Sequence, residues 1–275
     1  MKNTVSTFRA QKGLDKLTMV TAYDAMTARY VDECGIHAIL VGDSLGMVVL
    51  GLDDTLSVTL DDMIHHCKAV ARGTRNALLV CDMPFMTYHV NTDETVRNAG
   101  RLIQEARAHA VKLEGGVDFA GEVRALTRAS IPVMGHIGLT PQSVLSFGGF
   151  KVQGKSIAAA QKIVDDARAI QDAGAFSIVL EGIPARLGGW ITKNLEIPTI
   201  GIGAGPDCDG QVLVVQDLLG ITERSPKFVK RYGDVGSAMK QAFCAYKEDV
   251  QAGQFPDASY SYNVEAEEEI IAHLK

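Results

Sequence analysis

Short apolar runs alternate with longer amphipathic stretches along most of this chain, from about residue 18 to residue 220. The apolar runs are rich in β-branched residues and bounded by glycine, which is typical of strands buried on both faces of a parallel sheet. Several of the stretches between them begin at Thr, Ser or Asp and end at Gly, as capped helices do. The pattern predicts eight strands, at residues 17–23, 37–43, 77–83, 110–116, 131–138, 176–182, 198–205 and 211–217.

Eight strand–helix units in one chain favour a closed α/β barrel, the (β/α)8 or TIM barrel, over an open doubly wound sheet. The open sheet is the alternative, and it would be favoured again if one strand had been miscounted. After about residue 220 the pattern changes to an amphipathic helix at 235–253 and a short acidic one at 264–275. We therefore expect residues 1–275 to form a single barrel domain, with 221–275 as a helical C-terminal appendage.

Composition narrows the class of protein. The 275 residues are 47% hydrophobic and 22% charged, enough for a large core, and a net charge of −6 argues against a nucleic-acid partner. The first 17 residues hold no apolar segment typical of a signal peptide, and no run of about 18 apolar residues predicts a membrane span. Five cysteines without a C-x-x-C pair suit free thiols in a reducing compartment, so we expect a cytoplasmic protein.

Polar side chains end five of the predicted strands. Asp43, Asp82, Glu114, His136 and Glu181 each come at the carboxyl end of a different apolar run. In a (β/α)8 barrel the active site lies at the carboxyl ends of the strands. The fold would therefore gather these five side chains around one opening, although they are far apart in sequence.

Three of these carboxylates, Asp43, Asp82 and Glu114, end neighbouring strands. Like charges this close repel each other, so the group is unfavourable without a cation. An oxygen-only ligand set suits a hard ion, and Mg²⁺ fits best because it takes few carboxylates and keeps water or substrate oxygens on the rest of its shell. For either Asp taken singly, a helix N-cap or a turn is the alternative.

A lysine accompanies this group. Strand alternation places Lys112 and Glu114 on the same face of their strand, inside the barrel, while Val111 and Leu113 face the helices. Lys and Glu are almost never fully buried unless paired. Lys112 is therefore either a substrate contact or half of a structural ion pair with Glu114.

Glu181 and His136 are the remaining candidates. Glu181 lies across the opening with Val179 as its same-face neighbour, and a carboxylate against an apolar wall is favoured as a general base. A structural pair with Arg186 is the alternative. His136 faces inward as either a substrate contact or a buried core histidine. The GIGAG stretch at 201–205 is a weak phosphate-binding signal, and a tight strand exit accounts for it better.

Several stretches resemble the ketopantoate hydroxymethyltransferase family: TAYDAMTARYVDECGIHAILVGDSLGMVVLG, DMPF, AVKLEGG, IPVMGHIGLTPQ, KVQGKS and IPTIGIGAGPDCDGQVLV. They occur in the family's order and spacing, over roughly residues 3–255. Departures are peripheral. RAHAVKLEGG lacks a usual Gly-Ala pair, LEGIP lacks a Cys that often follows the Glu, and VVQDLLG has Gln where a His often precedes the Asp. They leave the expected chemistry intact.

The resemblance implies a Mg²⁺-dependent (β/α)8 barrel in pantothenate synthesis. Such an enzyme transfers a hydroxymethyl group from 5,10-methylenetetrahydrofolate to 3-methyl-2-oxobutanoate, through a metal-stabilised enolate, and forms 2-dehydropantoate. It also implies a homo-oligomer, a decamer. The sequence itself shows no folate site. By resemblance, the metal carboxylates are Asp43, Asp82 and Glu114, the substrate contacts are Asp43, Ser44, Asp82, Lys112 and His136, and the proton acceptor is Glu181.

Two other classes of protein share parts of this pattern. Barrel lyases and mutases of the isocitrate lyase and phosphoenolpyruvate mutase type also bind 2-oxo acids on Mg²⁺. The chain lacks a Lys-Lys-Cys-Gly-His type loop, and Cys81 falls on the helix-facing side of its strand, which disfavours that class. A non-catalytic metabolite-binding barrel would have no reason to combine an acidic cluster with an opposed Glu181.

Overall fold

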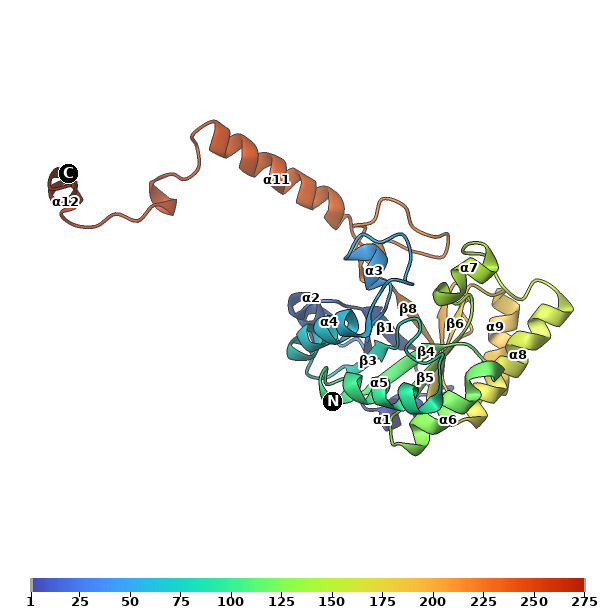
Figure 1. The fold of residues 1–275 in the computed structure, drawn as a ribbon. Helices are drawn as coiled ribbons and strands as arrows, with labels where there is room; N and C mark the ends of the chain where they lie inside the picture. The colour runs from blue at the N-terminus through green and yellow to red at the C-terminus, as the bar shows by residue number, and fades with distance from the viewer. Residues whose placement is uncertain (1, 275) are drawn as a thin grey trace.

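The computed structural model describes residues 2–274, and its main body is a closed barrel of eight parallel strands (Figure 1). The strands pair in sequence order, and β1 closes the barrel by pairing with β8. The predicted (β/α)8 barrel is confirmed and the open sheet is excluded. The strands are β1 Leu17–Thr21, β2 Ala38–Val41, β3 Leu78–Asp82, β4 Ala110–Glu114, β5 Val133–Gly138, β6 Ser177–Glu181, β7 Thr199–Ile202 and β8 Gly210–Leu213.

Two apolar layers hold the barrel together, and both follow from strand alternation. Side chains such as Leu40 and Val80 pack inside the barrel. Their neighbours along the chain, Ile39 and Cys81, belong to the larger layer between the strands and the surrounding helices. The expected helix-facing position of Cys81 is confirmed. Because both faces of the strands are buried, the strands appear in the sequence as nearly continuous apolar runs.

Helices surround the barrel, and polar caps fix where several of them begin. Asp24 accepts hydrogen bonds from the first turn of α2, Thr59 forms a capping box with Asp62 at α4, and Ser156 caps α8. The longer helices are α2 Ala25–Glu33, α4 Leu60–Gly73, α5 Thr92–Gln104, α6 Ala120–Arg128, α8 Ile157–Asp172 and α9 Ala185–Asn194. The short ones are α1 Val5–Arg9, α3 Leu45–Val48, α7 Val144–Phe147 and α10 Val215–Leu218.

The seventh and eighth units differ from the predicted pattern. Residues 203–209 connect β7 to β8 without a helix, so the chain does not contain eight complete strand–helix units. Gly203 and Gly205 adopt positive φ angles and Pro206 follows them, which leaves no continuous helical segment. The predicted eighth strand at 211–217 was too long, because the strand ends at Leu213 and α10 begins at Val215.

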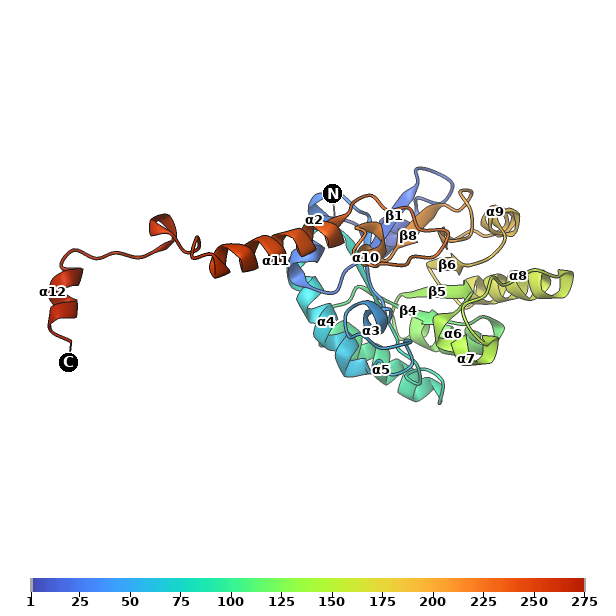
Figure 2. The ribbon, with the colours of Figure 1, turned by 90° about the horizontal axis from the view of Figure 1, so that it is seen from above.

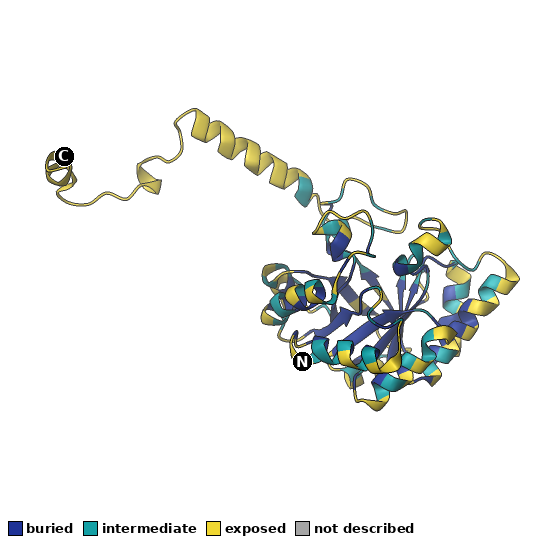
Figure 3. Cartoon of the chain, in the orientation of Figure 1, coloured by how far each residue is buried: buried dark blue, intermediate teal, exposed yellow. Residues whose placement is uncertain are grey.

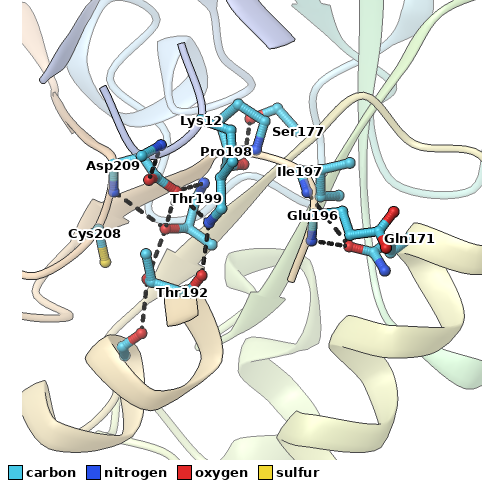
Figure 4. Close-up of polar contacts among 12 residues, drawn as sticks. Lys12, Gln171, Ser177, Thr192, Glu196, Ile197, Pro198, Thr199, Cys208 and Asp209 are labelled. Atoms are coloured by element: carbon cyan, nitrogen blue, oxygen red, sulfur yellow. Dashed lines mark hydrogen bonds and ion pairs between the residues drawn. The ribbon is translucent and has the colours of Figure 1, made fainter. Parts of the chain in front are cut away.

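A polar network closes the end of the barrel at which the strands begin (Figure 4). We call Lys12, Thr199 and Asp209 the basal network. Asp209 Oδ2 accepts hydrogen bonds from Lys12 Nζ at 2.8 Å and from Thr199 N at 2.8 Å, and Asp209 Oδ1 accepts one from Gly13 N at 3.1 Å. Phe8 of α1 packs edge-on against Phe176 at the same end. The basal network ties the segment before β1 to the start of β7 and to the segment that precedes β8.

The C-terminal part of the chain leaves the barrel. Helices α11 Val235–Gln251 and α12 Glu267–Ala272 project away from the body in both views (Figures 1 and 2), and we call residues 235–274 the arm. Residues 237–274 are all exposed (Figure 3). Within residues 2–274 no helix is long and apolar enough to cross a membrane.

Candidate active site

A cavity of about 400 Å³ opens at the carboxyl ends of the strands. Strand register brings its polar residues together, because Asp82 lies beside Lys112 on paired strands and Glu114 lies beside His136. The structure thus collects residues from β2 to β6 and from the segments that follow them. All seven side chains singled out in the sequence line this cavity: Asp43, Ser44, Asp82, Lys112, Glu114, His136 and Glu181.

Charged side chains form a continuous chain across one part of this cavity. We call Asp82, Lys112, Glu114, His136 and Glu181 the cavity floor. Lys112 Nζ lies 3.0 Å from Asp82 Oδ1 and 3.2 Å from His136 Nδ1. His136 Nδ1 lies 3.3 Å from Glu114 Oε1, and its Nε2 lies 3.1 Å from Glu181 Oε2. A single imidazole therefore connects the lysine side of the floor to the candidate base.

Neither of the two structural ion pairs that the sequence offered as alternatives is present within residues 2–274. Lys112 pairs with Asp82 instead of Glu114. Glu181 contacts His136, and within residues 2–274 no ion pair joins it to Arg186. The side chain of Glu181 is 15% exposed, compared with 4% for His136, so Glu181 is the more accessible of the two to a ligand in the cavity.

Burial and neighbouring charges shift the pKa values of Asp43 and of two residues of the cavity floor, Asp82 and Lys112. Burial raises the pKa of Asp43 well above its ordinary value, and the nearby carboxylates of Asp82 and Glu114 raise it further. Burial also raises the pKa of Asp82, although Lys112 partly opposes this. Burial acts to lower the pKa of Lys112, but the surrounding carboxylates outweigh it and raise that pKa. The three carboxylates of Asp43, Asp82 and Glu114 thus outnumber the single positive charge of Lys112.

His136 is drawn toward its charged form by the same carboxylates. Burial and the nearby Lys112 act to lower the pKa of His136, but Glu114 and Glu181 outweigh them and raise it to about 9. Its Nε2 makes no hydrogen bond of good geometry within residues 2–274, despite the 3.1 Å approach of Glu181. The Nε2 atom of the imidazole, which faces Glu181, is therefore free to form a hydrogen bond.

Of the three carboxylates that the sequence suggested as ligands of a hard cation, only Asp43 and Asp82 are arranged to bind one. Within residues 2–274 no three His, Cys, Asp or Glu side chains converge into one ligand set. Glu114 instead contacts His136 and accepts a hydrogen bond from Gln142 N. Asp43 and Asp82 both face the cavity, and Asp82 Oδ1 is buried without a well-aligned hydrogen bond. Mg²⁺ commonly takes one or two carboxylates and completes its shell with water and substrate, so this pair fits it.

Comparison with known proteins identifies the family. The family model described as ketopantoate hydroxymethyltransferase matches residues 2–258. The chain belongs to the ketopantoate hydroxymethyltransferase family. Membership in this family makes the chain an enzyme, a hydroxymethyltransferase.

Curated relatives agree with the family assignment. Proteins named 3-methyl-2-oxobutanoate hydroxymethyltransferase from Clostridium beijerinckii, Clostridium novyi and Enterococcus faecalis are 56%, 58% and 55% identical to this chain. The alignment covers 98% of both the chain and the C. beijerinckii protein, and 96% of the chain and 97% of each of the other two proteins. The resemblance noted from sequence motifs is therefore confirmed.

Solved structures support the fold alone. A 2,3-dimethylmalate lyase, described as a member of the PEP mutase/isocitrate lyase superfamily, has a TM-score of 0.61 at 17% identity, with 99% of both chains covered. Phosphonopyruvate hydrolase has a TM-score of 0.62 at 14% identity, with 98% of this chain and 94% of that chain covered. The ketopantoate hydroxymethyltransferase fold of this chain thus resembles the barrel of that superfamily.

Two residues that the sequence argument missed organise the site of this family member. Gln142 donates from Nε2 to Asp43 Oδ2 at 2.7 Å and from its backbone N to Glu114 Oε2 at 2.9 Å. Tyr88 Oη donates to Gln142 Oε1 at 2.6 Å and accepts from Glu114 N. Gln142 stands in the IPVMGHIGLTPQ motif, which could have drawn attention to it, whereas Tyr88 lies in a loop after β3 with no such signal.

Proposed function

We propose that this enzyme transfers a hydroxymethyl group from 5,10-methylenetetrahydrofolate to 3-methyl-2-oxobutanoate, forming 2-dehydropantoate in pantothenate biosynthesis. The relatives' names support the acceptor and the reaction class. The observation that carries the proposal is that one cavity presents a buried lysine, a pair of aspartates and a more accessible Glu181. This combination suits proton removal next to a carbonyl group.

Binding of the keto acid would use Lys112 and Ser44. A 2-oxo acid is a small anion, and the ammonium group of Lys112 supplies a positive charge at the bottom of the cavity. The Ser44 hydroxyl lies 2.9 Å from Tyr23 Oη, which holds it in a fixed position facing the same space. Asp43 and Asp82 would hold Mg²⁺, which when bound supplies positive charge that stabilises the keto oxygen as it becomes negative.

Glu181 would remove the proton from C3 of the keto acid. Its contact with His136 Nε2 orients the carboxylate toward the cavity. The carbanion then forms a bond to the methylene carbon of the folate, whose two C–N bonds break. One water supplies the hydroxyl group, and the two nitrogens of tetrahydrofolate take one proton from C3 and one from that water. Glu181 carries the first of these protons.

We also propose that the protein forms a homo-oligomer, specifically a decamer, and that it is cytoplasmic. The arm supports an oligomer because α11 carries exposed apolar side chains at helical spacing, Met239, Phe243, Tyr246 and Val250. A helix with such a stripe usually packs it against another element. We also propose that residues 221–275 are an appendage to a single barrel domain spanning the chain.

Turnover of 3-methyl-2-oxobutanoate with and without 5,10-methylenetetrahydrofolate tests the function. We expect 2-dehydropantoate only when keto acid, folate donor and Mg²⁺ are all present. A lyase or mutase would instead cleave or rearrange another 2-oxo acid without any folate. A barrel that only binds metabolites would give no product under any of these conditions.

A further inference from the structure

A second group of residues lines the cavity and comes from other parts of the chain than the floor. We call Asp217, Thr222, Arg224, Pro226 and Phe228, from α10 and the segment after it, together with Phe150 from the segment after α7, the cavity mouth. Cavities of about 300–1,000 Å³ accommodate drug-sized ligands, and a five-carbon keto acid is much smaller than that. A cavity of about 400 Å³ therefore leaves room beside the keto acid, and the mouth lines that room.

Asp217 is held so that one of its oxygens remains available. It lies on α10, and its Oδ1 accepts hydrogen bonds from Thr222 Oγ1 at 2.5 Å and from Ser225 Oγ at 3.3 Å. Its Oδ2 accepts no hydrogen bond within residues 2–274, although the side chain lines the cavity. The two hydroxyl groups thus fix a half-buried carboxylate whose second oxygen can accept from a ligand.

Phe228 supplies a flat apolar surface beside Asp217, and the GIGAG stretch explains its position. The Phe228 ring lies against Gly203, where a Cβ atom would come within 2.8 Å of ring atom Cδ1. Gly203 also has a φ of +65°, which side chains other than glycine rarely adopt. The glycine-rich stretch after β7 therefore makes room for an aromatic ring at the mouth.

Arg224 gives the mouth a positive charge. It lines the cavity from an exposed position, and within residues 2–274 its guanidinium group takes part in no ion pair. The mouth thus combines an aromatic face, a fixed carboxylate and an available guanidinium group. This set differs from the floor, where carboxylates and Lys112 contact each other directly.

We propose that the cavity mouth binds the folate co-substrate, with the reduced pterin ring against Phe228, its amino group donating to Asp217 Oδ2, and the glutamyl carboxylate paired with Arg224. A hydrogen bond from an N–H group to an ionised carboxylate is roughly twice as strong as one between neutral groups, so the single available oxygen of Asp217 suits the amino group of the pterin. A carboxylate tail matches the planar fork of arginine. This inference rests on the proposed function, because it assigns a subsite to the folate donor.

Equilibrium binding of tetrahydrofolate, measured calorimetrically under anaerobic conditions, tests the assignment. Loss of a charge-assisted hydrogen bond is typically worth tenfold or more in affinity, so Asp217→Asn should raise the Kd of tetrahydrofolate by about tenfold or more. Phe228→Ala should weaken binding in the same direction. Glu223→Gln is the matched control, because it removes an exposed carboxylate from the same loop at a residue that does not line the cavity.

A second measurement separates the failure of this inference from the failure of the proposed function. Exchange of the C3 proton of the keto acid in D2O, without folate, reports on the floor alone. We expect the variants to lose folate affinity while the KM for the keto acid changes less than the Kd for tetrahydrofolate. Wild-type folate affinity in both Asp217→Asn and Phe228→Ala would overturn the assignment, as would an equal loss in Glu223→Gln. If the wild type neither bound tetrahydrofolate nor turned over the keto acid, the proposed function would be overturned as well.

Discussion

Two buried aspartate–lysine pairs lie at opposite ends of the barrel and differ in their electrostatics. Asp82 pairs with Lys112 at the cavity floor, and Asp209 pairs with Lys12 in the basal network. Both side chains are shielded from solvent, at 5% and 6% exposed, but Asp82 is more deeply enclosed by protein atoms than Asp209. Burial raises the pKa of Asp82, whereas hydrogen bonds from Lys12 and Thr199 outweigh burial at Asp209 and lower its pKa. The difference in pKa therefore reflects both the deeper burial of Asp82 and the hydrogen bonds that Asp209 accepts.

The two carboxylates also differ in how completely they are satisfied. Both oxygens of Asp209 accept hydrogen bonds, from Lys12, Thr199 and Gly13. Asp82 Oδ2 accepts one from Asp43 N at 3.1 Å, but Asp82 Oδ1, which lies 3.0 Å from Lys112 Nζ, lacks a well-aligned hydrogen bond, and other carboxylates lie nearby. A satisfied buried pair stabilises a fold, while an unsatisfied one favours an added cation or substrate. We infer that the basal network serves stability and the floor serves catalysis, in line with the usual division between the two ends of such barrels.

Removal of the metal should give the largest difference in response between the cavity end of the barrel and the basal network. If Asp43 and Asp82 hold Mg²⁺, EDTA should reduce turnover to background and added Mg²⁺ should restore it. Asp82→Asn should weaken Mg²⁺ binding, followed by calorimetry, without unfolding the protein. Asp209→Asn is the matched variant at the other end and should keep the wild-type affinity for Mg²⁺. Full turnover in metal-free buffer would contradict the role given to Asp43 and Asp82.

Replacement of the candidate base should have the next largest effect. Glu181→Gln keeps the size of the side chain but cannot accept the proton, so kcat should fall by roughly 10²–10⁴-fold, the usual contribution of a general base. Steady-state kinetics at saturating substrate measures this loss. Glu196→Gln, at an exposed position just before β7, is the control and should behave as the wild type. A loss of less than about tenfold in Glu181→Gln would count against its role.

Lys112→Met should affect substrate binding more than stability. The ammonium group faces the expected position of the substrate carboxylate, and loss of such a charged contact typically weakens binding by roughly tenfold or more. The KM for the keto acid should therefore rise. A purely structural pair with Asp82 would instead give a lower Tm and an unchanged KM. Thermal melting together with kinetics distinguishes the two results.

The basal network should show the opposite response. Asp209→Asn should lower the free energy of unfolding by about 1–3 kcal/mol, because charged hydrogen bonds to Lys12 and Thr199 are lost. Its kcat should stay within about twofold of the wild type, because Asp209 lies at the end of the barrel opposite the cavity. Denaturant unfolding measures the stability change. Asp207→Asn, at an exposed position two residues earlier, is the control.

The pH dependence of this stability difference has a defined sign. The pKa of Asp209 is lower in the folded protein than in the unfolded chain, so its ionised form stabilises the fold. The contribution is fully present above the unfolded value of about 3.9 and is lost as the pH falls through the folded value. The stability gap between wild type and Asp209→Asn should therefore be constant near neutral pH and shrink in acid. A gap that widened in acid would contradict the pairing.

The sequence predicted the barrel and the position of its charged residues because both depend on short-range patterns. Strand alternation places Lys112 inward, and the carboxyl end of a strand places Glu181 at the opening. It did not predict that Lys112 pairs with Asp82, because that depends on the register between two strands. Gln142 and Tyr88 were missed since they reach the site from loops, whose paths no periodic pattern determines.

Exchange of the C3 proton of 3-methyl-2-oxobutanoate in D2O, without any folate, tests the central claim most directly, because it isolates the chemistry of the cavity floor. The wild-type enzyme with Mg²⁺ should exchange this proton, followed by NMR. Glu181→Gln should lose exchange by roughly 10²–10⁴-fold while still binding the keto acid. Exchange by Glu181→Gln at the wild-type rate would contradict the assignment of the base, and His136 would then be the next residue to test.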